Sequence, residues 1–148
     1  IDLAVMPLGI EIPARFHAQV LTDDVTYAFF SPRFPNAEQI HELMDLKDAV
    51  MFAGPEYNGL WQYLHNYFQH RGVKANLSYD PGMSIFTERM IIESGEGVGF
   101  GGKYSLLYRN QDLRRLPLEM TGALGAVWCG DNSNPVIRPY IRGLLAQF

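Results

Sequence analysis

The chain has 148 residues, of which 47% are hydrophobic and 19% are charged, which suits one compact domain able to bury a core. Its net charge is −4 and its 12 basic residues are scattered, so this segment alone presents no basic face for DNA. No apolar run is long enough to span a bilayer, and we expect no membrane partner. The single cysteine, Cys129, excludes an internal disulfide and fits a reducing, cytoplasmic compartment.

Short apolar or alternating segments bounded by turn residues predict β-strands along the whole chain. The segment 16–32 is expected to form two strands, joined where the polar residues Thr22 to Asp24 interrupt it. Residues 113–119 and 122–129 are expected to form two further strands. The other expected strands are residues 2–6, which we expect to be buried, 48–53, 75–80 and 98–100.

Four segments carry the caps and apolar spacing of helices: residues 36–46, 57–72, 84–95 and 134–148. In the first, Asn36 is the expected N-cap and Gln39 completes a capping box. Ser84 is the expected N-cap of the third helix and Gly95 follows its end, whereas the last helix is expected to begin at Asn134. Strands that alternate with helices predict an α/β fold with a largely parallel sheet.

A glycine-rich loop follows the third expected helix. Gly97, Gly99 and Gly102 form the pattern G-x-G-x-x-G, and Glu119 follows where a ribose-binding acid would stand. A dinucleotide-binding loop leaves a strand and enters a helix, however, and here the helix comes first and a short strand follows. We therefore expect Gly95 to end the helix and Gly97 and Gly99 to allow close packing, with no cofactor bound.

No catalytic or metal-binding pattern is present in the sequence. The four histidines form no His-x-x-x-His pair, and one cysteine cannot form Cys-x-x-Cys. No Gly-x-Ser-x-Gly elbow surrounds a serine, and the acidic residues form no evident pair. We expect no metal, no catalytic residue and no enzymatic activity.

Two expected helix starts, at residues 54–59 and 80–84, follow expected strands. Ligands of open α/β sheets bind at the carboxyl ends of strands, and free amides at a helix start favour an anion such as a small carboxylate. Ordinary capping by Asn58 and Ser84 explains the same residues equally well.

The segment "SIFTERMIIESGEGVGFGG" (84–102) resembles the effector-binding domain of LysR-type transcriptional regulators. It has the polar cap Ser84, the apolar helix and the paired glycines Gly95 and Gly97 of that family. It departs from the family at Gly102, where proline is usual, and at Glu96, where an apolar residue is common. The segments "IDLAVMPLG", "AQVLTDDVTYAFFSPRFP" and "NPVIRPYIRGLLAQF" are similar to the family's first strand, its crossing stretch and its closing helix.

The resemblance implies a type 2 periplasmic-binding-protein-like fold, in which two α/β subdomains are joined by crossing strands. The first subdomain would comprise residues 1–20 and 118–148 and would be incomplete, and the second would comprise residues 21–117. A winged-helix DNA-binding domain, a linker helix and about half of the first subdomain would precede Ile1. DNA would then be bound only through that N-terminal domain, and the regulator would be a homodimer or homotetramer.

The same resemblance implies that a small effector binds in the cleft between the subdomains and that its binding shifts their arrangement. With the two helix starts, it nominates these candidate effector-binding residues: Pro7, Leu8, Glu56, Tyr57, Asn58, Ser84, Ile85 and Phe86. A periplasmic-type solute-binding protein has the same fold and is the main alternative, and a dinucleotide-binding enzyme fragment is the other. The Thr-Arg-Phe motif of prephenate dehydratases, enzymes that share this fold, is absent.

Overall fold

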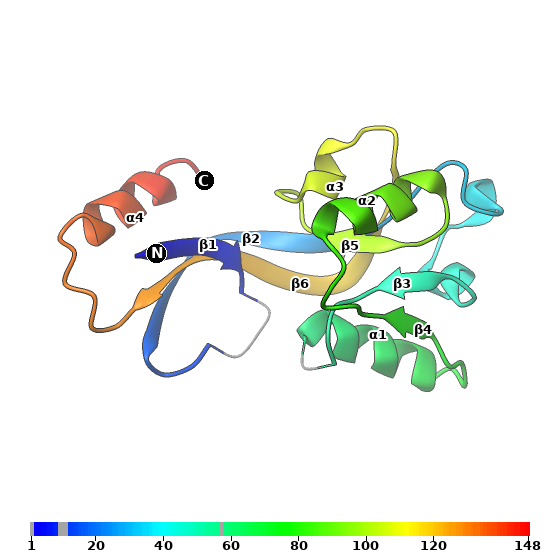
Figure 1. Cartoon of the computed structure of the whole chain (residues 1–148), viewed down its shortest axis with the longest axis horizontal. Coiled ribbons are helices and arrows are strands. Elements are labelled where there is room, and N and C mark those ends of the chain that lie inside the picture. Colours follow the sequence, from blue (N-terminus) through cyan, green and yellow to red (C-terminus); the bar gives the residue numbers. More distant parts are fainter. Residues whose placement is uncertain (1, 9–11, 57) are drawn as a thin grey trace. The chain divides into compact units, whose positions relative to one another are not determined.

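The structure is a computed structural model that describes residues 2–8, 12–56 and 58–148 (Figure 1). The chain forms two compact units. Unit 1 comprises Ile1–Asp24 and Thr121–Phe148, and unit 2 comprises Val25–Met120. The units are described separately below.

Two long strands, β2 (Phe16–Phe30) and β6 (Arg114–Cys129), each pass from one unit into the other. They belong to a four-stranded sheet in the order β1-β6-β2-β5. The prediction that each segment forms two strands is wrong. The polar residues Thr22 to Asp24 continue β2 without turning the chain: Asp23 is exposed, and Thr22 and Asp24 are half-buried.

Unit 1 contains β1 (Leu3–Pro7), which pairs antiparallel with β6, and the helix α4 (Ile137–Leu145). Ile137 and Ile141 of α4 pack with Leu21 of β2 and Ala126 of β6. The strand β1 is present as predicted, but it is not buried: Val5 is 46% exposed, because β1 lies at the edge of the sheet.

The helix α4 begins three residues later than predicted. Asn134 does act as a cap, but of a turn: its Oδ1 accepts a hydrogen bond from the backbone N–H of Val136 at 3.0 Å. Pro135 lies in this turn rather than in the helix.

In unit 2, the strands β3 (Val50–Phe52) and β4 (Asn76–Ser78) are parallel and are connected through the helix α1 (Gly59–Gln69). The helix α2 (Ile85–Ser94) then leads to β5 (Gly99–Gly101), which pairs antiparallel with β2. A one-turn helix, α3 (Leu106–Arg109), follows. A largely parallel sheet was therefore a wrong prediction: the β1–β6 and β2–β5 pairs are antiparallel, because strand direction depends on connections that alternation in the sequence does not reveal.

The core of unit 2 lies on both faces of β2. Ala28 and Phe30 pack in one cluster with Leu64 and Phe68 of α1, whereas Phe29 packs with Ile92 of α2 in another. Alternate side chains of a strand point to opposite faces. The helix α1 therefore covers one face, and α2 with α3 covers the other (Figure 1).

The segment predicted as a helix at 36–46 instead forms two short 3-10 helices, η1 (Ala37–Gln39) and η2 (Leu43–Leu46). Asn36 has a φ of 57° and makes no side-chain cap, and Gln39 forms no capping box. The capping box is formed by Glu42 and Asp45, whose carboxylate accepts backbone hydrogen bonds that lower the pKa of Asp45. This capping box starts a new turn at Glu42 and so divides the segment in two.

The glycine loop turns and packs the chain, as predicted. Gly95 ends α2 with a φ of 88°. A Cβ on Gly97 would lie 2.6 Å from Cε2 of Phe52, and a Cβ on Gly99 would lie 2.3 Å from Cδ1 of Ile92. A side chain at either position would force the neighbouring side chain to shift.

Candidate functional site

Two helices of unit 2 begin at the same end of the parallel pair β3–β4, since α1 follows β3 and α2 follows the next strand, β4. Oδ1 of Asn58 accepts a hydrogen bond from the N–H of Leu60 at 2.9 Å, and Oγ of Ser84 accepts one from the N–H of Thr87 at 3.1 Å. Both residues are therefore N-caps, as the sequence predicts. Their helices direct the positive ends of their dipoles to one edge of the pair.

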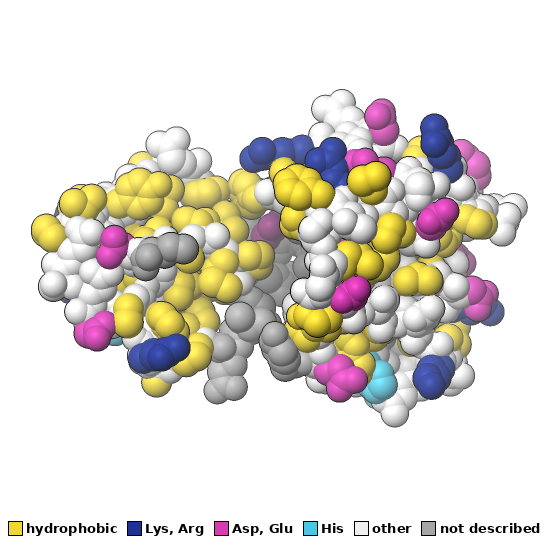
Figure 2. Space-filling model, in the orientation of Figure 1, with side chains coloured by type: hydrophobic (Ala, Val, Ile, Leu, Met, Phe, Trp, Pro, Cys, Tyr) yellow, Lys and Arg dark blue, Asp and Glu magenta, His cyan; other side chains and the backbone are white. Residues whose placement is uncertain are grey.

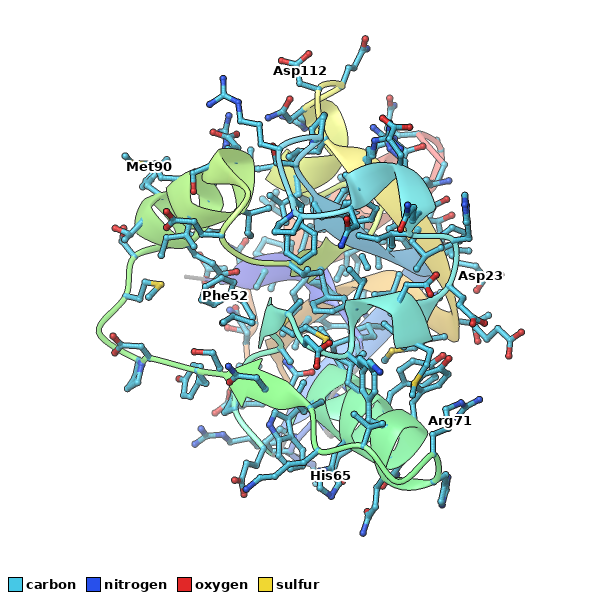
Figure 3. All side chains as sticks on the ribbon, turned by 90° about the vertical axis from the view of Figure 1, so that its right-hand side faces the viewer. Asp23, Phe52, His65, Arg71, Met90 and Asp112 are labelled. Carbon is cyan, nitrogen blue, oxygen red and sulfur yellow. The ribbon has the colours of Figure 1, made fainter. Side chains whose placement is uncertain are left out.

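A pocket of about 450 Å³ lies at this edge, and we call it the strand-end pocket. Its apolar wall includes Phe52 at the end of β3 and Phe100 of β5, and Figure 3 shows Phe52 lying below α2. Its polar wall includes Asn58 and Ser78. The volume is within the range of small-molecule sites, about 300–1,000 Å³. The other lining residues are Ala53, Gly54, Leu60, Tyr79, Asp80, Pro81, Met83, Ile85 and Glu88.

The charged residues among the described lining residues are Asp80 and Glu88. Oδ1 of Asp80 accepts a hydrogen bond from the N–H of Gly82 at 2.8 Å, which holds the turn before α2. Glu88 is half-buried, and its burial raises the pKa of its carboxyl group. This side of the pocket thus combines the positive end of a helix dipole with a carboxyl group that binds a proton more readily than usual.

The structure brings together two of the predicted site residues, because Asn58 and Ile85 both line the strand-end pocket. Ser84 lies between the lining residues Met83 and Ile85, and its Oγ is also 3.0 Å from Oγ1 of Thr87. Phe86 does not line the pocket and is 66% exposed.

The remaining predicted site residues lie elsewhere. Glu56 lines another pocket of unit 2, with Trp61 and His65. Tyr57 lies outside the described residues. Pro7 and Leu8 belong to unit 1, where the side chain of Leu8 packs over Gly125: a Cβ on that glycine would lie 2.2 Å from Cδ1 of Leu8.

Apart from Asn58 and Ile85, the lining residues of the strand-end pocket were not among the predicted site residues. Phe52 and Phe100 stand at or near strand ends, but their apolar character is also that of ordinary core residues. Glu88 could have been found from the sequence, because it stands four residues after Ser84 and therefore lies on the same side of α2, one turn later.

The described part of the chain contains no group of three or more His, Cys, Asp and Glu side chains placed to hold a metal ion. Within the same residues, no helix has the length and apolar character needed to cross a membrane. Cys129 is half-buried, and its thiol donates a hydrogen bond to Oδ1 of Asp131 at 2.8 Å.

No protein-family profile matches this sequence, and no curated protein matches it. Solved structures do match the fold. The regulatory domain of OxyR2 from Vibrio vulnificus in its reduced form has 18% identity and a TM-score of 0.66, over 99% of this chain and 71% of that one. HinK, a LysR family transcriptional regulator from Pseudomonas aeruginosa, has 18% identity and a TM-score of 0.69, over 99% of this chain and 53% of that one. CbnR, another LysR family regulator, has 10% identity and a TM-score of 0.67, over 97% and 51%.

This chain therefore has the fold of LysR-family regulatory domains, which is type 2 periplasmic-binding-protein-like, and the resemblance seen in the sequence is confirmed at the level of fold. The chain spans about half the length of HinK and CbnR. HinK and CbnR are LysR family transcriptional regulators, and the OxyR2 structure is a regulatory domain.

Proposed function

We propose that this chain is the effector-binding domain of a LysR-type transcriptional regulator and acts as a cytoplasmic ligand sensor without catalysis. The observation that carries the proposal is the strand-end pocket, where two capped helices of unit 2 begin at one edge of β3–β4. The fold supports it, since the matching regulatory domains share it over almost the whole chain. DNA contacts would be made by another part of the regulator, because this chain has a net charge of −4.

The effector would be a small molecule that meets the starts of α1 and α2, near Asn58, Ser84 and Ile85. Contributions from Pro7, Leu8, Glu56, Tyr57 and Phe86, and a position of the effector between the two subdomains, stay predictions.

The two helix N-termini favour an anionic effector, whereas the carboxylates of Asp80 and Glu88 oppose one. These tendencies are compatible if Glu88 takes up a proton when the anion binds. Burial already raises the pKa of its carboxyl group, and a neighbouring negative charge would raise that pKa further. The proposed effector is thus a small carboxylate that binds more tightly as the pH falls.

A panel of small mono- and dicarboxylates, screened by thermal shift and then calorimetry, tests the site. Ser84→Ala should weaken binding of a hit by about 1–2 kcal/mol, the size of a hydrogen bond to a charged group. Because the variant also loses a helix cap, the matched control is Ser105→Ala, which removes the N-cap of α3 outside the pocket. Equal affinities in Ser84→Ala and the unaltered chain would remove Ser84 from the site.

Glu88→Gln tests the charge of the effector. For an anion, this variant should bind more tightly at neutral pH and lose the pH dependence. A cationic effector would show the opposite: affinity in the unaltered chain would fall with falling pH, and Glu88→Gln would bind less tightly.

We also propose that the regulator self-associates, as a homodimer or homotetramer, through exposed apolar faces of α2 and α4. On α2, Ile85, Phe86 and Met90 are each more than 60% exposed, and on α4 Val136 before its first turn is 62% exposed. Figure 2 shows hydrophobic side chains at the surface over both helices. Trp61 of α1 is a weaker candidate for the interface, because it is partly buried against the core of its own unit.

Sedimentation of the chain over a concentration series tests this interface. Phe86→Glu should shift the protein towards monomer, because a carboxylate cannot be buried without a partner. Gln69→Glu adds the same charge at an exposed position of α1 and should leave the distribution unchanged. Identical distributions in both variants would exclude α2 from the interface.

A further inference from the structure

A second pocket, of about 410 Å³, lies within unit 1 where β6 ends and α4 begins, and we call it the α4 pocket. Its walls come from the start of β2, the end of β6, the loop that follows and the first turn of α4. None of its residues belongs to the strand-end pocket of unit 2. It is therefore a separate site, whatever the role of the other.

The charged or titratable groups among its described lining residues are His17 and Arg138, and no lining residue is acidic. Two carboxylates near the pocket each accept a hydrogen bond from a neutral group: Asp2 from Nδ2 of Asn132 at 2.9 Å, and Asp131 from the Cys129 thiol. In the described part of the chain, no carboxylate forms an ion pair with Arg138. A cationic side chain without a carboxylate partner at a cavity favours an anionic ligand.

The other wall of the α4 pocket is apolar and aromatic. It includes the indole of Trp128 and the side chain of Ile137, and the ring centroids of His17 and Trp128 are 5.7 Å apart. Gly130 lies beside these rings, and a Cβ there would lie 3.0 Å from Nε2 of His17. Because Gly130 has no side chain, the imidazole of His17 can lie at the pocket without a steric clash.

A ligand that satisfies both walls has a negatively charged group for Arg138 and an apolar or aromatic body for Trp128. Ser133 and Asn134 add hydroxyl and amide groups to the lining, and the N-terminus of α4 contributes its dipole to the same side. We propose that the α4 pocket is a second ligand site that binds a small apolar carboxylate, with Arg138 as the partner of the carboxylate and Trp128 as the wall for the apolar body.

The fluorescence of Trp128 can report binding in this pocket, because Trp61 is the only other tryptophan in the sequence. In the Trp61→Phe chain, titration with benzoate should change the fluorescence of Trp128 saturably. Benzamide, which has nearly the same shape but no charge, should bind at least about tenfold more weakly, since a charge-assisted hydrogen bond is lost. Inorganic phosphate separates recognition of a bare anion from recognition of an apolar carboxylate.

Arg138→Gln in the same background should weaken benzoate binding at least about tenfold. Arg142→Gln is the matched control, because it removes the same charge from the next turn of α4 but does not line the pocket. Both arginines are exposed, so neither change should affect folding, which circular dichroism would check.

The proposal is overturned if benzoate produces no saturable change, if benzamide binds as well as benzoate, or if the two arginine variants weaken binding equally. Saturable binding of phosphate with no response to benzoate would also overturn it, because the apolar wall would then play no part. Ser84→Ala and Glu88→Gln should leave benzoate binding at Trp128 unchanged, so failure here and failure of the effector site in unit 2 are distinguishable.

Discussion

Unit 2 and unit 1 share the strands β2 and β6 but bury them differently. In unit 2 the consecutive residues Ala28, Phe29 and Phe30 of β2 are all buried, because helices cover both faces. In unit 1 the described part of the same strand buries only Leu21. Burial along a strand is thus determined by the layers on its two sides and not by the strand's own residues.

The comparison extends to the cores. The buried cluster of unit 1 consists, among the described residues, of Leu21, Ala126, Ile137 and Ile141. Unit 2 has two clusters that include large, fully buried side chains such as Phe29 and Phe68. Because the hydrophobic contribution grows with the apolar area buried, unit 2 should be the more stable unit by itself.

The largest expected effect is the loss of a large side chain from the core of unit 2. Phe68→Ala should lower the free energy of unfolding by about 3–5 kcal/mol, because it removes a fully buried ring and leaves a cavity. Ile141→Ala in unit 1 should cost less, since its cluster is smaller and more open to solvent. Urea denaturation measures both changes, and a larger loss for Ile141→Ala would contradict the comparison.

The next effect tests packing against the glycine loop. Gly99→Ala should destabilise by about 1–3 kcal/mol, since its Cβ would overlap Ile92 and Leu107. Gly122→Ala in β6 of unit 1 is the matched control, because no atom lies within 4 Å of the added Cβ. Thermal denaturation should show a lower midpoint for Gly99→Ala alone, and equal midpoints would show that the close approach has no energetic consequence.

A smaller effect depends on pH. Glu93 of α2 accepts hydrogen bonds from Nε of Arg89 at 2.7 Å and from Nδ2 of Asn110 at 2.8 Å, and these lower the pKa of its carboxyl. A lowered pKa in the folded state stabilises the protein above the unfolded value, near 4.3, and this contribution disappears as the pH falls through the folded value.

Glu93→Gln should therefore cost about 1 kcal/mol at neutral pH and almost nothing in acid, because the pair is partly exposed. Denaturation of both proteins at several pH values gives the difference. A difference that stays constant with pH would exclude the carboxylate as its source.

The smallest expected effect is a stabilisation of unit 1. Gly143→Ala should stabilise α4 by about 0.5–1 kcal/mol, because glycine inside a helix loses more backbone entropy and the new methyl group meets no atom within 4 Å. Hydrogen exchange should then slow in α4 and stay unchanged in α1. Slower exchange in α1 alone would contradict the assignment of the effect to unit 1.

The candidate site was predictable from the sequence where its features are local. The caps at Asn58 and Ser84 were predicted correctly, because each depends on a side chain and a backbone N–H two or three residues away. Glu88 lines the strand-end pocket and Glu56 does not. The sequence does not predict this difference, because it depends on how neighbouring segments pack.

By itself, the sequence determined the helices α1 and α2, the left-handed turn at Gly95 and the glycines that allow close packing, since caps, apolar spacing and the lack of a Cβ are properties of a few adjacent residues. Only the tertiary structure decided that β2 and β6 are continuous, that their pairs are antiparallel and that β1 is exposed at an edge. The physical reason is that strands are completed by hydrogen bonds and side-chain layers from segments far apart in the chain, so the same polar residues can form a turn or continue a strand according to the neighbours they meet.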